Sequence, residues 1–77
     1  FWRTASGQKV DLIVDIGQKL VPIEIKLSAT PHPGMAEGIA AFREALGRKA
    51  GPGWVVHPGD VQLPLAPNVR SLPFADL

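Results

Sequence analysis

Residues 10–28 read VDLIVDIGQKLVPIEIKLS, and this stretch decides the fold. Two runs rich in β-branched residues, 10–16 and 20–27, flank the dipeptide Gly17-Gln18. A two-residue connection that begins with glycine is typical of a type II′ turn, so the stretch predicts a β-hairpin. Pro22 cannot donate a hydrogen bond within a sheet, and it therefore indicates an edge, a bulge or the start of the second strand.

The turn also predicts the register of the hairpin. With Gly17-Gln18 as the loop, the facing pairs on one side are all apolar: Val10 with Ile25, Leu12 with Ile23, and Val14 with Val21. A slip of one residue would place Leu12 opposite Glu24 and break up this apolar face. Turn chemistry and hydrophobic matching thus favour the same register.

The other face of the hairpin carries charge. In this register Asp11 faces Glu24 and Lys9 faces Lys26, with Cβ atoms of facing residues about 4.5–5.5 Å apart. Two neighbouring carboxylates oppose each other's ionisation, and a bridging Mg²⁺ would relieve that repulsion. The residues therefore predict a magnesium site made by Asp11, Glu24 and the carbonyl of Ile25, with Lys26 beside it. The alternative is a solvated face on which the charges neutralise one another.

The remainder of the chain predicts a small α/β domain. Apolar residues recur at helical spacing over residues 35–49, and they form one stripe: Met35, Ile39, Phe42 and Leu46. Short strands are expected at 1–4, 54–57 and, at the C-terminus, 69–72. The predicted order is β-β-β-α-β, a mixed sheet with three antiparallel strands, a crossover helix and a parallel fourth strand.

Composition excludes several classes of protein. The chain has 77 residues, a size that fits a single domain over 1–77. It contains no cysteine, which excludes disulfides and thiolate metal sites. Eight basic and seven acidic residues give a net charge of +1, without the strong basic excess of many nucleic-acid-binding domains. No apolar stretch is long enough for a membrane span, and His32 and His57 are too isolated to indicate a metal site.

Asp11 followed by Glu24-x-Lys26 on two adjacent strands resembles the PD-(D/E)XK nuclease superfamily. The resemblance implies a restriction-endonuclease-like core, here without the helix with which that fold normally begins. It also implies that Asp11 and Glu24 bind Mg²⁺ and that Lys26 assists the attack of water on a phosphodiester. The expected activity is Mg²⁺-dependent endonuclease cleavage of nucleic acid.

A longer set of residues is similar to one family in particular. Trp2-Arg3, Gly7, the run 10–14 and the run 22–28 resemble the C-terminal domain, of unassigned function, of bacterial and archaeal AAA-type P-loop ATPases. That family commonly has Glu before the Val-Asp pair, where this chain has Lys9.

The resemblance implies a cytoplasmic fragment of a longer chain, in keeping with a sequence that starts at Phe1 without Met. The ATPase module of the same chain is the expected partner. Apolar surface left uncovered in the fragment would allow it to self-associate. The alternative function is a catalytically inactive structural or interaction module of the ATPase.

Overall fold

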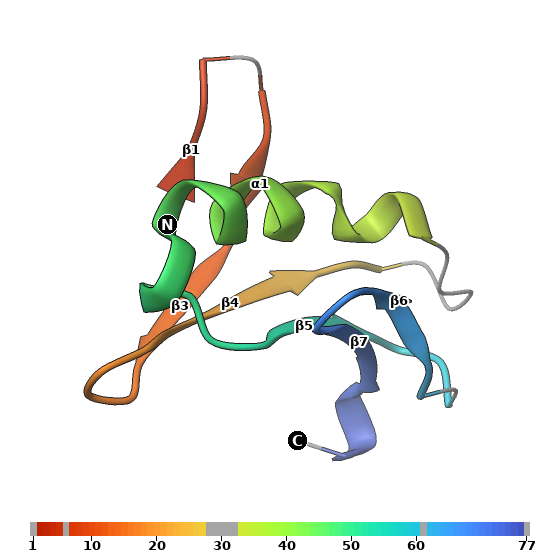
Figure 1. Ribbon diagram of the computed structural model, residues 1–77. Helices are drawn as coiled ribbons and strands as arrows, with labels where there is room; N and C mark the ends of the chain where they lie inside the picture. Colours follow the sequence, from red (N-terminus) through yellow and green to blue (C-terminus); the bar gives the residue numbers. More distant parts are fainter. Residues whose placement is uncertain (1, 6, 28–32, 61, 77) are drawn as a thin grey trace.

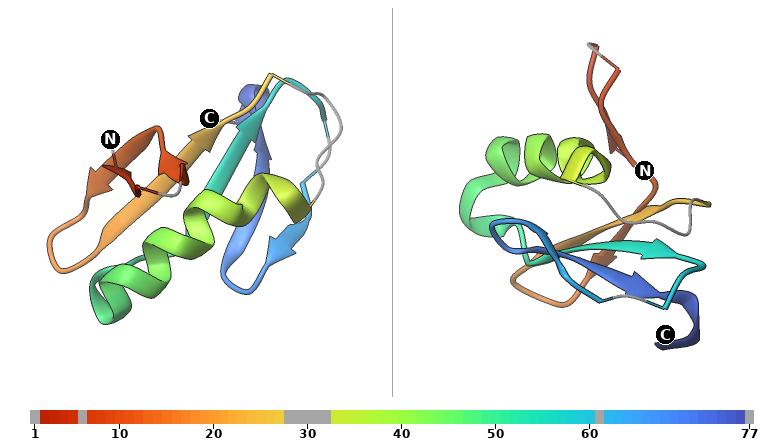
Figure 2. Two further views of the ribbon diagram at one scale, coloured as in Figure 1. Left: turned by 90° about the horizontal axis from the view of Figure 1, so that it is seen from above. Right: turned by 90° about the vertical axis from the view of Figure 1, so that its right-hand side faces the viewer.

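A mixed β-sheet with one α-helix lying across it forms the body of the protein in the described residues (Figures 1 and 2). The computed structural model describes residues 2–5, 7–27, 33–60 and 62–76, so most of the loop predicted before the helix, with His32, lies outside the described residues. The strands are β1 (Trp2–Arg3), β2 (Lys9–Val10), β3 (Leu12–Asp15), β4 (Leu20–Ile25), β5 (Gly53–His57), β6 (Pro64–Ala66) and β7 (Val69–Pro73). The helix is α1 (Glu37–Leu46), and short 3₁₀ helices span Pro33–Ala36, Gly47–Lys49 and Phe74–Asp76.

The sheet is partly antiparallel and partly parallel, with the strand order β3-β4-β5-β7-β6. β3 and β4 form the antiparallel hairpin, and α1 connects β4 to β5, which run parallel. β7 extends the parallel part and β6 pairs antiparallel with it at the edge. The α/β class and the crossover from hairpin through helix to a parallel strand are therefore confirmed.

The predicted register of the hairpin is confirmed from Leu12 to the turn. Leu12 pairs with Ile23 and Val14 with Val21. At the turn, the Ile16 N–H donates to the carbonyl oxygen of Lys19 at 3.0 Å. Gly17 has a φ of 100°, a conformation that glycine adopts without steric cost.

Pro22 lies inside an interior strand, so its expected place at an edge, a bulge or a strand start is wrong. It is opposite Ile13, and the pairing of β4 with β5 begins one residue later, at Ile23. Proline is tolerated at this point because the ladder to β5 does not yet need the N–H that proline lacks.

The strand predicted at residues 10–16 divides at Asp11, which corrects the prediction of one continuous strand. The part before Asp11 is β2, which pairs with β1 in a separate two-stranded sheet. The part after Asp11 is β3, which pairs with β4. The first three predicted strands thus form two antiparallel pairs in different sheets.

The division changes the partners of β2. Lys9 lies opposite Arg3, and Val10 lies opposite Trp2. The predicted pairs of Lys9 with Lys26 and of Val10 with Ile25 are therefore not formed. Figure 1 shows the β1–β2 arm rising beside α1, away from the main sheet.

The apolar stripe of the predicted helix forms the core. Met35, Ile39 and Phe42 are all buried, and the ring of Trp2 packs edge-on against Phe42 with 5.5 Å between centroids. The α-helix is shorter than the predicted 35–49, and 3₁₀ turns flank it on both sides. Gly47 ends the α-helical part with a φ of 58°, which glycine adopts without steric cost.

Two glycines allow α1 to lie close to the strands. A Cβ atom at Gly38 would lie 2.1 Å from the carbonyl oxygen of Lys9, and one at Gly53 would lie 2.3 Å from Cγ2 of Ile39. Glycine inside a helix costs about 1 kcal/mol relative to alanine. Gly38 is therefore explained by the packing of the helix on β2 and not by helix formation.

The strand predicted at 69–72 is confirmed as β7, between β5 and β6. β6 was not predicted, because proline at its first position is unfavourable in most strands. As an edge strand it tolerates Pro64.

On the sheet face that points away from α1, the part formed by β3 and β4 is apolar and exposed. Leu12, Val14 and Ile25 are 48%, 38% and 47% exposed. The short helix Phe74–Asp76 lies on this side of the sheet (Figure 1). In the described part of the chain, no helix has the length and apolar character needed to cross a membrane.

Candidate functional site

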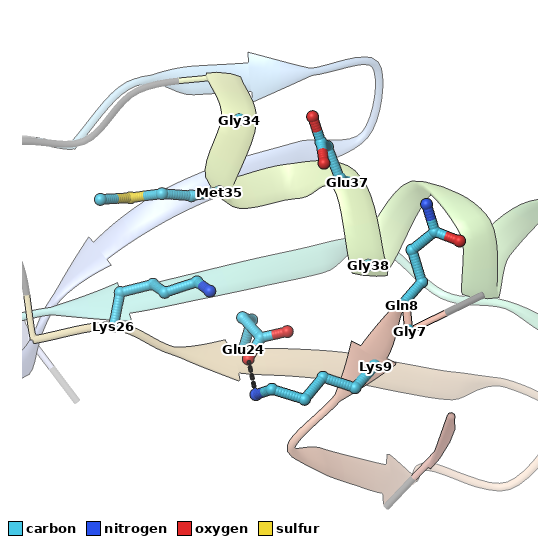
Figure 3. A pocket seen from close by; sticks show the side chains of 9 residues that line it. All are labelled: Gly7, Gln8, Lys9, Glu24, Lys26, Gly34, Met35, Glu37 and Gly38. Atoms are coloured by element: carbon cyan, nitrogen blue, oxygen red, sulfur yellow. Dashed lines mark hydrogen bonds and ion pairs between the residues drawn. The ribbon is translucent and has the colours of Figure 1, made fainter. Parts of the chain in front are cut away.

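The charged residues predicted on the hairpin lie on the side of the sheet covered by α1. Glu24 is the second-last residue of β4, Lys26 follows the end of that strand, and Asp11 lies at the bend between β2 and β3. Glu24 and Lys26 line a cavity of about 170 Å³ between β4, the β1–β2 arm and the start of α1 (Figure 3). The lining residues are Gly7, Gln8, Lys9, Glu24, Lys26, Gly34, Met35, Glu37 and Gly38.

Asp11 and Glu24, here called the carboxylate pair, are joined by Lys9. Lys9 Nζ lies 2.7 Å from Asp11 Oδ1 and 3.1 Å from Glu24 Oε1. The Glu24 side chain is only 3% exposed, whereas those of Asp11 and Lys9 are 30% and 44% exposed. One ammonium group therefore contacts both carboxyl groups, one of them inside the protein, and balances the charge of only one.

The second oxygen of Asp11 explains why the strand divides there. Asp11 Oδ2 accepts a hydrogen bond from the backbone N–H of Ile25 at 3.0 Å. In a continuous hairpin this N–H would pair with the main chain of Val10. The side chain of Asp11 takes that place, which frees β2 to turn away and pair with β1.

The two carboxyl groups have opposite pKa shifts. Burial, followed by the neighbouring Asp11, raises the pKa of Glu24 above its ordinary value despite the opposing effect of Lys9. A hydrogen bond with the Glu24 carboxyl, and then those from Lys9 and the Ile25 N–H, hold the pKa of Asp11 far below its usual range although desolvation opposes this. Hydrogen bonds to Asp11 and then Glu24 raise the pKa of Lys9. The structure thus favours charged Asp11 and Lys9, and a Glu24 that takes up a proton readily.

These shifts predict how stability depends on pH. Because folding raises the pKa of Glu24, the free energy of unfolding should increase as pH falls from 7 toward about 5. Because folding lowers the pKa of Asp11, its contribution is present above its ordinary pKa of about 3.9 and is lost on further acidification. Urea denaturation at pH 7, 5 and 3 measures both changes.

The Glu24→Gln variant is the control for this pH dependence, since it cannot take up the proton. We expect the part of the increase between pH 7 and 5 that comes from Glu24 to be absent in this variant. An equal increase in both proteins would contradict the assignment to Glu24.

Sequence reasoning missed the role of Lys9. It was expected to face Lys26 and add positive charge, but it contacts the carboxylate pair instead. The spacing Lys9-x-Asp11 on an extended chain was a usable signal, because residues two apart share a face. The approach of Gly38 to Lys9 and Glu24 had no local signal.

Two further polar side chains, those of Asp15 and His57, have structural roles. Asp15 is exposed, and its Oδ1 accepts the Gly17 N–H at 2.8 Å, which stabilises the hairpin turn. His57 is buried, and its Nδ1 accepts the Gly59 N–H at 3.1 Å. Among the residues that the structure describes, no group of three or more His, Cys, Asp or Glu is arranged to hold a metal ion.

The comparison with protein families matches the whole chain. A family model described as "Domain of unknown function (DUF4143)" covers residues 1–77. The chain belongs to the DUF4143 family. No match is found among curated proteins or among solved structures. For this DUF4143 domain, the argument for function therefore rests on the residues of the site.

Proposed function

We propose that this DUF4143 domain is a PD-(D/E)XK-type nuclease-like module of a P-loop ATPase that hydrolyses phosphodiester bonds in nucleic acid with Mg²⁺. Asp11 and Glu24 are the proposed metal ligands, with the carbonyl of Ile25, and Lys26 is the proposed catalytic cation. The observation that carries the proposal is the meeting of the Asp11 and Glu24 carboxyl groups at one ammonium group, with Glu24 and Lys26 lining the same cavity.

The topology also supports the proposal. An antiparallel hairpin, a crossover helix and a parallel strand follow one another, and the carboxylate pair lies on the hairpin. This is the order expected of a restriction-endonuclease-like core. The short spacing from Glu24 to Lys26 brings both side chains to the same cavity (Figure 3).

The donor set fits a hydrated magnesium ion. Mg²⁺ binds through hard oxygen atoms and often takes only one or two carboxylates, with water completing the coordination. The Ile25 N–H points toward Asp11, and the carbonyl of a strand residue faces the same side as its N–H. Two carboxylates and one carbonyl are thus available, provided that Lys9 gives up its contacts. A bound Mg²⁺ would polarise a phosphate and acidify a water.

The other lining residues suit a phosphate. The Lys26 side chain extends along the cavity toward Glu24 (Figure 3), where its ammonium would hold a phosphate oxygen or a water by charge-assisted hydrogen bonds. Gln8 lines the same cavity from the β1–β2 arm.

A cleavage assay tests the proposed function. The 77-residue chain is incubated with supercoiled plasmid and with single-stranded RNA, in 5 mM Mg²⁺ or Mn²⁺ and in EDTA. We expect cation-dependent cleavage that falls about 100-fold or more in Lys26→Ala and in Asp11→Asn, because each loses a group that acts on the transition state.

The matched control is Asp15→Asn, which removes an exposed carboxylate on the same hairpin outside the cavity. Its cleavage rate should equal that of the unaltered chain. Absence of cleavage, or cleavage that the Lys26 and Asp11 variants leave unchanged, would refute the nuclease proposal.

An inactive interaction module is the second candidate, and the open sheet face favours it. Leu12, Val14 and Ile25 expose apolar surface that suits packing against the ATPase module or a second copy of the fragment. This candidate predicts no cleavage under any of the conditions above, so the same assay separates the two.

A further inference from the structure

Lys9 is held in place by its backbone. The carbonyl oxygen of Lys9 lies so close to Gly38 of α1 that a Cβ atom added at Gly38 would be only 2.1 Å from it. Lys9 also pairs with Arg3 across the β1–β2 arm. The main chain of Lys9 is thus fixed between a helix and a strand. Its side chain is 44% exposed and retains room to move.

The side chain of Lys9 ends where the two carboxylates converge. Of the four carboxylate oxygens, Asp11 Oδ2 is engaged by the Ile25 N–H, and Glu24 Oε2 faces Gly38, 3.3 Å from the place a Cβ would take. The remaining two, Asp11 Oδ1 and Glu24 Oε1, are the oxygens that Lys9 Nζ contacts. A divalent cation bridging the pair would need the same two oxygens.

We propose that Lys9 is a resident counter-ion that occupies the cation position between Asp11 and Glu24, so that a divalent cation binds only by displacing it. The inference rests on the proposed function, because it takes the carboxylate pair as a metal site. Competition follows from charge and from geometry together. Two carboxylates that already share one ammonium group attract a cation less strongly. The two oxygens that face each other across Lys9 Nζ, Asp11 Oδ1 and Glu24 Oε1 (the inner oxygens), are already hydrogen-bonded to it.

Lys26 differs from Lys9 in position and provides the control. Both ammonium groups reach the cavity, but the ion pairs described for the carboxylate pair are both made by Lys9. Removing either lysine changes the net charge equally. Only the removal of Lys9 should free the inner oxygens.

The experiment compares the affinity for Mn²⁺ of the unaltered 77-residue chain, Lys9→Gln and Lys26→Gln, by calorimetry and by paramagnetic broadening of the Ile25 amide. We expect Lys9→Gln to bind Mn²⁺ at least tenfold more tightly than the unaltered chain, and Lys26→Gln to differ from it by less than threefold. The gain should disappear in the double variant Lys9→Gln/Asp11→Asn.

The outcomes separate the two proposals. Equal affinities of the unaltered chain and Lys9→Gln, both dependent on Asp11, would overturn the role of Lys9 and leave the metal site standing. Equal gains in Lys9→Gln and Lys26→Gln would overturn it too, because net charge alone would explain them. If Lys9→Gln binds no Mn²⁺, the metal site fails, and the role of Lys9 fails with it.

A second measurement needs no variant and covers a Lys9→Gln protein that does not fold. With ¹⁵N-labelled lysine, the ammonium resonance of Lys9 is followed during addition of Mg²⁺ to the unaltered chain. Displacement predicts that this resonance and the Ile25 amide shift together and saturate at one concentration. A shift of the Ile25 amide with the Lys9 resonance unmoved would overturn the inference.

Discussion

Replacing Gly38 with alanine is expected to lower the free energy of unfolding by about 2 kcal/mol, although alanine is the better helix former. The new methyl group would lie 2.1 Å from the carbonyl oxygen of Lys9, a backbone atom that cannot move aside as a flexible side chain would. Overpacking of this kind costs up to about 3 kcal/mol. The higher helix propensity of alanine offsets about 1 kcal/mol of this cost, which leaves a net loss of about 2 kcal/mol. Urea denaturation at neutral pH measures it.

The matched control is Ala40→Gly, at an exposed position of the same helix. It should lose about 1 kcal/mol from propensity alone. If Gly38→Ala were instead stabilised by about the same amount, propensity would decide the outcome, and the close approach of α1 to β2 would be wrong.

The Phe42→Ala variant should lose about 3–5 kcal/mol, as expected for a large aromatic ring deleted from a core. Phe42 is 1% exposed, and the loss also removes the edge-to-face contact with Trp2 that fastens the β1–β2 arm to α1. A domain of this length has a total stability of roughly 4–12 kcal/mol. The variant is therefore expected to lose at least about a quarter of this stability.

Circular dichroism and urea denaturation at 10 °C measure this loss. Phe74→Ala is the control, because Phe74 is 39% exposed and begins the short helix Phe74–Asp76, which lies on the opposite side of the sheet from α1. It should lose less than about 1 kcal/mol. Equal losses in the two variants would contradict the placement of Phe42 in the core.

The hairpin could be predicted from sequence because two independent signals agree. Gly17 selects the turn, and the apolar pairs Leu12–Ile23 and Val14–Val21 select the same register. Both signals are local, and a register slip would reverse every side chain. The neighbourhood of Asp11 and Glu24 followed from that register alone.

The division of the strand at Asp11 could not be predicted in the same way. It depends on a side chain replacing the main chain as the partner of the Ile25 N–H, and on Val10 finding Trp2 as its new partner. Alternation of apolar and polar residues is identical in a continuous and in a divided strand. The position of Lys9 Nζ between the carboxylates follows from this division, and so it was missed as well.

The helix shows the same limit. Its buried stripe was readable from the spacing of Ile39 and Phe42, whereas Gly38 gave only the signal of a weak helix position. Only tertiary packing shows why glycine is there, since the atom it makes room for belongs to Lys9, far earlier in the chain.

The glycines that line the cavity have a consequence for ligand selection. Gly7, Gly34 and Gly38 make part of its wall out of bare peptide groups, and Gly38 stands against the backbone of β2 with no side chain between them. This part of the wall has no rotamers to change, so any adjustment of the cavity to an entering group falls to its side chains, among them those of Lys9 and Lys26. The glycine wall also leaves peptide groups, and no side chains, facing a ligand on that side.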